Sequence, residues 1–421
     1  MFTTMKKFGI TIGLCLLASI AIGQKKAVSD ALRLANDSKY ADARNKIKEA
    51  LEHAETKDDA KTWYTAGKIE DMEFAAENAK VQLGQPPNDG VRYAALLNVW
   101  PFFKKAMELD KIPDAKGKVK PKYTKDILSI MKDNMPFYIN GGGHFFEPAV
   151  KDFKKSMDFF DQIIEITDLG GIWPMKKEPT GIVKEGDVPD STYIQSNFYA
   201  AVAAYQLGDP KEAVRTMERS SYVDYQRNDI FQLLSEQYLA NEDTVNYEKT
   251  LERGLAVFPS EPFYTHHLVN LYTNANKNEK ALEYLNMAIK LDPNDAQLHL
   301  VSGRVNEFLD NLSEAEENYL KSVELDGENP EGLFNLGGLY FNQGANYLDE
   351  ISNINDIKKY NEEKEKVYEF FRKALPYFEK AYELKPDMSA QLPSTLRNIY
   401  YHLEMDDKLK WISKIMGVEE E

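Results

Sequence analysis

The stretch PFYTHHLVNLYTNANKNEKALEYLNMAIKLDPND, residues 262–295, decides the fold of this chain. In its first half, apolar residues recur at the i, i+3 and i+4 spacing of an α-helix: Leu268, Leu271 and Tyr272. The second half repeats this spacing at Ala281, Tyr284, Leu285 and Ala288. The stretch therefore predicts two amphipathic helices, roughly 262–275 and 278–291, joined by a short polar turn.

The same pattern recurs along the chain with a period of 34 residues. Pro259 and Pro293 are separated by this interval, and so are Tyr238 and Tyr272. Ala213, Ala281 and Ala315 fall on the same grid. One helix pair alone leaves an apolar face exposed, so neighbouring pairs must stack to bury it.

These residues are similar to the tetratricopeptide repeat family. Its pattern places Trp or Leu, Leu-Gly and Tyr on a first helix, and Ala, an aromatic residue, Ala and Pro from the second helix onward. The first half is matched by Leu333, Leu336, Gly337 and Tyr340, and the second half by Ala374, Phe378, Ala381 and Pro386. The resemblance implies an all-α fold, a right-handed superhelical solenoid of about nine helix-turn-helix units without a separate catalytic body.

The register divides the chain into regions. Residues 24–167 hold three degenerate units, and residues 168–193 contain turn signals without periodicity, which predict a linker. The regular array covers 194–388, with an insertion at about 345–369 that is expected to form extended helices beyond the stack. These helices could dock a partner or cover the neighbouring unit. Residues 389–421 predict capping helices followed by an acidic tail.

Residues 1–23 have the features of a cleavable signal peptide. Lys6 and Lys7 precede an uncharged run, and small residues stand at Ala21 and Gly23. Cys15, the only cysteine, does not stand in a lipoprotein cleavage box. We therefore expect export, and no transmembrane segment after residue 23. The layout of the whole chain resembles that of exported tetratricopeptide proteins of Gram-negative bacteria, and this resemblance implies a location in the periplasm.

Composition and motifs argue against several classes of function. The chain carries 52 Lys+Arg and 68 Asp+Glu, a net charge of −16, which disfavours nucleic acid and anionic lipid as partners. It has no phosphate-binding loop, zinc-protease motif or nucleophile elbow, so we expect no catalytic residue, cofactor or metal site. The run Asn140–Gly143, between two expected helical stretches, is interpreted as a helix end or a tight helix contact rather than a phosphate cradle. His266, His267 and His299 are expected to be satisfied or surface residues.

A lysine-rich stretch stands out on this acidic chain. It contains Lys111, Lys116, Lys118, Lys120, Lys122 and Lys125. It predicts a solvated loop or a contact with an acidic partner.

Partner binding is expected on the first helices of the units, which line the concave side of such a solenoid. Steps of 34 residues give two columns, Gln232, His266, Leu300 and Phe334, and Glu236, Asn270, Arg304 and Gly338. They predict a polar and aromatic groove for an extended protein segment, with Arg304 as its main contact. Some members of the family bind a C-terminal carboxylate with a clamp of Lys, Asn and Arg. The matching positions of this chain are His266, Asn270, Val301 and Glu331, so only the asparagine of the clamp is present.

The leading hypothesis is a non-enzymatic scaffold for protein–protein interactions in the bacterial cell envelope. The alternative is a periplasmic chaperone-like or glycan-associated accessory protein that holds an outer-membrane or secretion client. A Tyr- and Phe-rich groove without fixed charges would favour the alternative.

Overall fold

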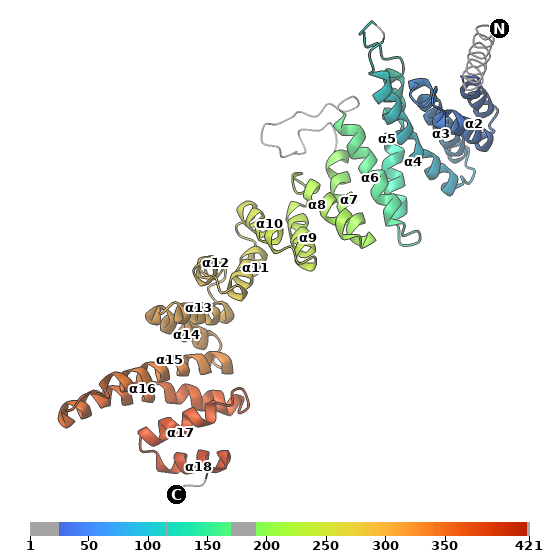
Figure 1. Cartoon of the computed structure of the whole chain (residues 1–421). Coiled ribbons are helices and arrows are strands. Elements are labelled where there is room, and N and C mark those ends of the chain that lie inside the picture. Colours follow the sequence, from blue (N-terminus) through green and yellow to red (C-terminus); the bar gives the residue numbers. More distant parts are fainter. Residues whose placement is uncertain (1–24, 115, 170–190, 419–421) are drawn as a thin grey trace, which may run out of the picture. The chain divides into compact units, whose positions relative to one another are not determined.

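The computed structural model describes residues 25–114, 116–169 and 191–418. Every secondary-structure element in these ranges is an α-helix (Figure 1). This confirms the predicted all-α repeat fold. The expected signal peptide (1–23), most of the expected linker (168–193) and the last three residues of the acidic tail lie outside the described residues. No helix within these ranges has the length and apolar composition needed to cross a membrane.

The chain divides into two compact units, with the boundary between Glu242 and Asp243. Unit 1 begins with helical residues 25–36 and continues with α2 (Tyr40–Glu52), α3 (Ala60–Gln82), α4 (Asp89–Asp110), α5 (Thr124–Phe146), α6 (Phe153–Asp168), α7 (Thr192–Leu207), α8 (Pro210–Ser220) and α9 (Arg227–Ala240). Unit 2 contains α10 (Thr244–Val257), α11 (Pro262–Asn274), α12 (Asn278–Leu291), α13 (Ala296–Phe308), α14 (Leu312–Leu325), α15 (Pro330–Ile351), α16 (Ile357–Leu384), α17 (Leu392–His402) and α18 (Asp406–Met416). Within each unit, helices that follow each other in the chain pack together.

The turns inside the repeats keep the 34-residue period in their backbone conformation. Gly208, Glu242, Asn276 and Asp310 each lie 34 residues from the next, and all four have a positive φ between 53° and 73°. At Gly208, Asn276 and Asp310, which lie within one unit, the left-handed residue at the helix end reverses the chain within a few residues, so the next helix folds back on the preceding one. Only the first of the four is glycine; the others adopt a conformation that is uncommon for residues with a side chain. The boundary between the units falls next to one of these turns, at Glu242.

Small residues allow the two helices of a pair to approach closely. In the pair α13 and α14, a Cβ atom built on Gly303 would lie 2.4 Å from Cδ1 of Tyr319. The Tyr319 ring is fully buried between helices, so it cannot turn away. Close-packed interiors have no spare volume for such an added atom.

Gly303→Ala is therefore expected to destabilise unit 2 by about 1–3 kcal/mol, because the added methyl group overpacks the Tyr319 ring. Gly338→Ala is the matched control: it also lies inside a helix, but its added Cβ would meet nothing within 4 Å. Since alanine favours helix over glycine, this control should gain up to about 1 kcal/mol. Urea unfolding monitored by hydrogen exchange in peptides of 243–418 compares the two. Equal shifts would show that Gly303 does not mark a tight crossing.

The run Asn140–Gly143 lies inside α5 and not between two helical stretches, so its predicted location was wrong. The interpretation as a tight helix contact is confirmed. A Cβ on Gly141 would lie 2.7 Å from the Phe159 ring of α6, and one on Gly142 would lie 2.6 Å from the Phe160 ring. The glycines admit aromatic rings of the next helix, and their place inside a helix leaves no loop of free amide groups to hold a phosphate.

The insertion at about 345–369 lengthens both helices of one pair, as expected. Helix α15 has 22 residues and α16 has 28, whereas α13 and α14 have 13 and 14. Figure 1 shows the long pair extending past its neighbours within unit 2. Ile351 and Val367, from the insertion, are buried in the core of this unit. They are packing residues of the α15–α16 pair and are not available to a partner.

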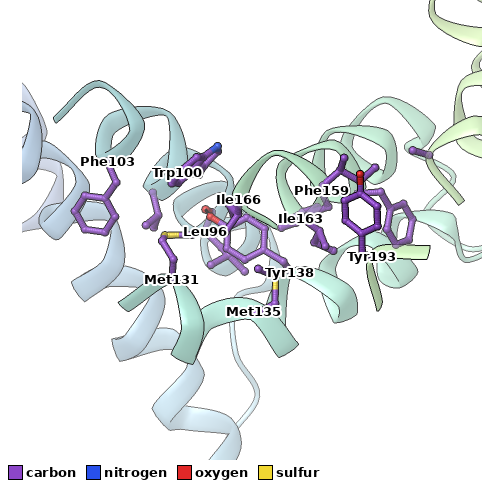
Figure 2. Packing of buried hydrophobic residues seen from close by; sticks show 14 of the residues in the cluster. Leu96, Trp100, Phe103, Met131, Met135, Tyr138, Phe159, Ile163, Ile166 and Tyr193 are labelled. Atoms are coloured by element: carbon purple, nitrogen blue, oxygen red, sulfur yellow. Dashed lines mark hydrogen bonds between the residues drawn. The ribbon is translucent and has the colours of Figure 1, made fainter. Parts of the chain in front are cut away.

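The core of unit 1 is rich in aromatic residues. Figure 2 shows Trp100 on α4, Tyr138 on α5 and Phe159 on α6 in one continuous cluster. Tyr138 is fully buried, and its hydroxyl donates a hydrogen bond of 2.9 Å to the carbonyl oxygen of Leu96. This bond satisfies a polar group that would otherwise be costly to bury. The degenerate repeats thus retain a packed core although their sequences depart from the 34-residue pattern.

Candidate partner-binding face

The structure distributes the predicted groove residues over both units. Gln232 and Glu236 lie on α9 in unit 1, half-buried and exposed, respectively. The others lie in unit 2: His266 and Asn270 on α11, Leu300 and Arg304 on α13, and Phe334 and Gly338 on α15.

Leu300 does not belong to a binding surface, and this part of the prediction was wrong. Its side chain has no exposed area and packs in the core with Tyr319 and Leu333. Helix α13 contacts α12, α14 and α15, so its buried stripe is wider than the i, i+3, i+4 pattern indicates. Phe334, one repeat later, is half-buried, with its ring centroid 5.7 Å from that of Phe378. The side chains of Leu300 and Phe334 therefore pack inside the unit and offer little or no surface to a partner.

Asn270 and Arg304, from the second column, are exposed. The Arg304 guanidinium donates to the Glu331 carboxylate, with 3.1 Å between Nη1 and Oε1, and each side chain is 53% exposed. The pair joins α13 to the first turn of α15. An ion pair this exposed contributes only about 0–1 kcal/mol. Arg304 can therefore exchange Glu331 for a carboxylate of a partner at little cost.

Phe308 is a surface residue that the sequence columns missed. It ends α13, one helical turn after Arg304, and its side chain is 75% exposed. Residues four apart share one face of a helix, so the ring and the guanidinium lie on the same side. The i+4 spacing from Arg304 was visible in the sequence, but exposure could not be read from it. We call Arg304, Phe308 and Glu331 the partner face; Asn270, the residue of the same column one repeat earlier, is exposed on α11.

Tyrosines that recur on the first helices of unit 2 connect successive helix pairs. Tyr272 on α11 donates a 2.6 Å hydrogen bond to Glu248 on α10, and Lys280 Nζ lies 4.7 Å from the Tyr272 ring centroid. The same Tyr, Glu and Lys arrangement recurs at Tyr340, Glu316 and Lys373, and at Tyr400, Glu379 and Lys408. These groups are used within unit 2 and leave the partner face to other residues.

These connections also shift acid–base equilibria. The hydrogen bond from Tyr272 and the nearby Lys280 ammonium lower the pKa of the Glu248 carboxyl. Burial, followed by the hydrogen bond to Glu248, raises the pKa of Tyr272. Burial and the Glu252 charge raise the pKa of Tyr284, which stacks on Tyr272, to about 12. Both tyrosines therefore stay protonated and can donate over the whole physiological range.

The histidines take part in packing, which agrees with their expected role. His267 Nδ1 lies 2.6 Å from the Tyr247 hydroxyl. His299 Nδ1 lies 3.2 Å from Asn318 Oδ1, and His299 Nε2 lies 3.1 Å from the Pro293 carbonyl oxygen. His266 is half-buried on α11. Within the part of the chain that the structure describes, no three His, Cys, Asp or Glu residues come together as metal ligands.

A pocket of about 490 Å³ lies at the other end of unit 2, between α16, α17 and α18. Its lining includes Tyr382, Leu396 and Trp411, with the Tyr382 and Trp411 rings edge to face at 5.9 Å. The Glu379 carboxylate in its wall already accepts hydrogen bonds from Tyr400 and Lys408. The wall of the pocket is therefore largely apolar, and its Glu379 carboxylate is already engaged within the unit.

Comparison with known proteins gives one family match and several distant likenesses. Residues 266–295 match the sequence model of the tetratricopeptide repeat. Over 60 residues the chain is 45% identical to "Protein CTR9 homolog" of Arabidopsis thaliana; this stretch is 14% of the chain and spans only 5% of that protein.

Two solved structures illustrate the distant likenesses. A MamA structure is 16% identical, with a TM-score of 0.36, over 44% of this chain and 88% of its own. YrrB, described as a TPR protein with an unusual peptide-binding site, is 16% identical with a TM-score of 0.32, over 50% of this chain and 95% of its own.

The family match falls on α11 and α12, the pair from which the 34-residue register extends through the neighbouring turns. The pair has the two amphipathic helices and the short turn that its sequence predicts, and the structure adds that Asn276 in this turn is left-handed. The family model thus matches one helix pair, and the 34-residue register and the stacked helix pairs continue an all-α repeat of this kind through the neighbouring helices.

Proposed function

We propose that this protein is a non-enzymatic scaffold that binds a protein partner through the partner face of unit 2. The observation that carries the proposal is the exposed Phe308 ring one helical turn from the half-exposed Arg304 guanidinium. Arginine and aromatic side chains dominate binding energy at protein interfaces. The face suits an extended segment that offers a carboxylate to Arg304 and an apolar side chain to Phe308.

The cellular setting is a second part of the proposal. The sequence of residues 1–23 supports export, and we propose that the partner is a protein of a Gram-negative cell envelope. A chaperone-like or glycan-associated role is the alternative. Such a role would need an apolar groove without fixed charges, whereas the partner face contains the Arg304–Glu331 ion pair. The charged pair favours a defined partner over a range of unfolded clients. If the purified protein suppressed aggregation of an unfolded barrel protein, and Arg304→Glu did not alter this, the alternative would be preferred.

The test is a photo-crosslinking amino acid placed at position 308 in the native cell, followed by mass spectrometry of the adducts. Position 357 is the control, because Ile357 on α16 is 77% exposed and lies outside the partner face. We expect one predominant adduct from position 308 that position 357 does not give.

Variants then measure affinity for the protein identified in this way. Arg304→Glu and Phe308→Ala are each expected to weaken binding at least about tenfold, as hot-spot residues do. The matched control is Lys321→Glu, which reverses the charge of another ion-paired basic residue, on α14, 3.0 Å from Glu324. This control should leave affinity within about twofold. If both face variants bind as well as the control, the assignment of the face is wrong.

A further inference from the structure

A compact basic loop joins α4 to α5 and contrasts with the acidic remainder of the chain. It contains six lysines: Lys111, Lys116, Lys118, Lys120, Lys122 and Lys125. All six are exposed, and none of them forms an ion pair with another described residue. In Figure 1 this segment extends beyond the ends of α4 and α5. We call residues 111–114 and 116–125 the lysine loop.

The acidic residues in and beside the lysine loop are engaged by its backbone. Asp110 accepts hydrogen bonds of 2.8 Å from the amides of Lys122 and Tyr123 and of 3.0 Å from that of Thr124, which ties the end of the loop to its start. Asp114 Oδ1 accepts bonds of 2.9 Å from the amides of Lys116 and Lys118. These carboxylates shape the loop instead of forming ion pairs with its lysines. The described part of the loop therefore has a backbone held by these carboxylates, with six exposed lysine side chains.

Two aliphatic side chains accompany the lysines. Ile112 and Val119 are 60% and 49% exposed, and they flank the turn in which the Asp114 amide donates to the Lys118 carbonyl oxygen. The aromatic ring of the loop is not available, because Tyr123 is half-buried against Tyr64, with their ring centroids 4.6 Å apart. Exposed aliphatic side chains among lysines make a surface with both apolar and cationic character.

We propose that the lysine loop docks on an anionic lipid surface, with lysines at the lipid phosphates and Ile112 and Val119 in the headgroup region. The composition favours lipid over an acidic protein. Lysine is depleted from protein interfaces, and the loop offers no arginine and no exposed aromatic side chain, which are the usual anchors there. Clustered lysines next to aliphatic groups are typical of segments that bind anionic membranes reversibly.

The negative charge of the whole chain does not oppose this docking at close range. At physiological salt, charges more than about 8 Å from a contact are largely screened. The lysine loop lies at the end of a helix pair, so its own charges determine the local attraction. The expectation from net charge alone, that anionic lipid is disfavoured, therefore does not apply to this segment.

The experiment measures the partition of the full chain onto two kinds of vesicle. One is made of phosphatidylcholine alone, and the other also contains about one third phosphatidylglycerol, which makes its surface anionic. We expect binding to the anionic vesicles only, and loss of binding as salt rises. The triple variant Lys116→Gln, Lys118→Gln, Lys120→Gln should lower the partition coefficient by about a hundredfold, since each lysine near such a surface contributes about fivefold. Ile112→Ser with Val119→Ser should also weaken binding, but without changing its salt dependence.

The matched control is Lys48→Gln, Lys57→Gln, Lys61→Gln, which removes the same charge from exposed lysines elsewhere in unit 1. It should bind like the unaltered chain. Equal losses in the two triple variants would overturn the proposal, because binding would then follow net charge. The absence of binding to anionic vesicles would also overturn it and would leave a solvated loop. If polyglutamate bound the loop while the vesicles did not, the partner class would be an acidic polypeptide and the lipid proposal would be wrong.

Discussion

Replacing Trp100 with alanine is expected to lower the free energy of unfolding of unit 1 by about 3–5 kcal/mol. The indole is 1% exposed and lies in the aromatic core between α4, α5 and α6 (Figure 2). Its Nε1 donates a 2.8 Å hydrogen bond to Glu165, which also accepts from Lys104. Truncation leaves a cavity that the surrounding rings cannot fill, and it removes a donor from this carboxylate.

Trp100→Phe separates most of the cavity effect from the loss of the donor, because it keeps one buried aromatic ring and removes the N–H group. We expect this variant to lose about 1–2 kcal/mol, the contribution of one hydrogen bond to a charged group together with a smaller ring. Hydrogen exchange in peptides of α4, α5 and α6 under increasing urea gives both values. A Trp100→Ala protein that exchanges like the unaltered chain would show that this cluster does not hold unit 1 together.

Replacing Arg44 with methionine should destabilise unit 1 by about 3–5 kcal/mol, because it leaves a buried carboxylate without its cation. Arg44 on α2 binds Glu70 on α3 through two bonds, Nε to Oε1 at 2.8 Å and Nη2 to Oε2 at 2.7 Å, and it also contacts Glu73. The Glu70 side chain is 4% exposed, whereas that of Arg44 is 35% exposed. The loss therefore arises mainly from the unpaired Glu70 charge and less from lost packing.

A second substitution tests this explanation. Arg44→Met leaves both Glu70 and Glu73 without their cation, and adding Glu70→Gln removes the more deeply buried of these two charges, so the double variant should regain much of the lost stability. Equilibrium urea unfolding of the single and double variants measures the coupling between the two positions. If the double variant were as unstable as Arg44→Met, the cost would come from packing around the methionine, and the charge argument would fail.

The α11–α12 pair shows how much of the structure can be predicted from the sequence of this protein. Its helix bounds, the turn at Asn276 and the burial of Ala281 follow from residues that lie within 34 positions of each other. The insertion was also recognised as extended helices, because its apolar spacing continues that of the flanking segments. Local periodicity is sufficient here, since each helix is specified by its own neighbours in the chain.

At the partner face, the sequence does not predict which side chains are exposed. Leu300 and Arg304 are one turn apart on α13, and the sequence treats them alike, but the first is buried and the second is exposed. Phe308 is apolar and was not selected, although it is the most exposed of the three. Exposure depends on how many neighbouring helices contact α13, and this is a property of the stack and not of the helix.

By itself, the amino-acid sequence determined the class of the fold, the repeat period and the positions of the helices in the regular repeats such as α11 and α12. Only the tertiary structure decided that Asn140–Gly143 is helical, that Arg44 pairs with Glu70 across 26 positions, and that the lysine loop is ordered by Asp110 and Asp114. The physical reason is the range of the interactions. Helix periodicity arises from contacts three or four residues apart, whereas burial, ion pairing and the use of a carboxylate by a distant amide depend on which segments meet in space.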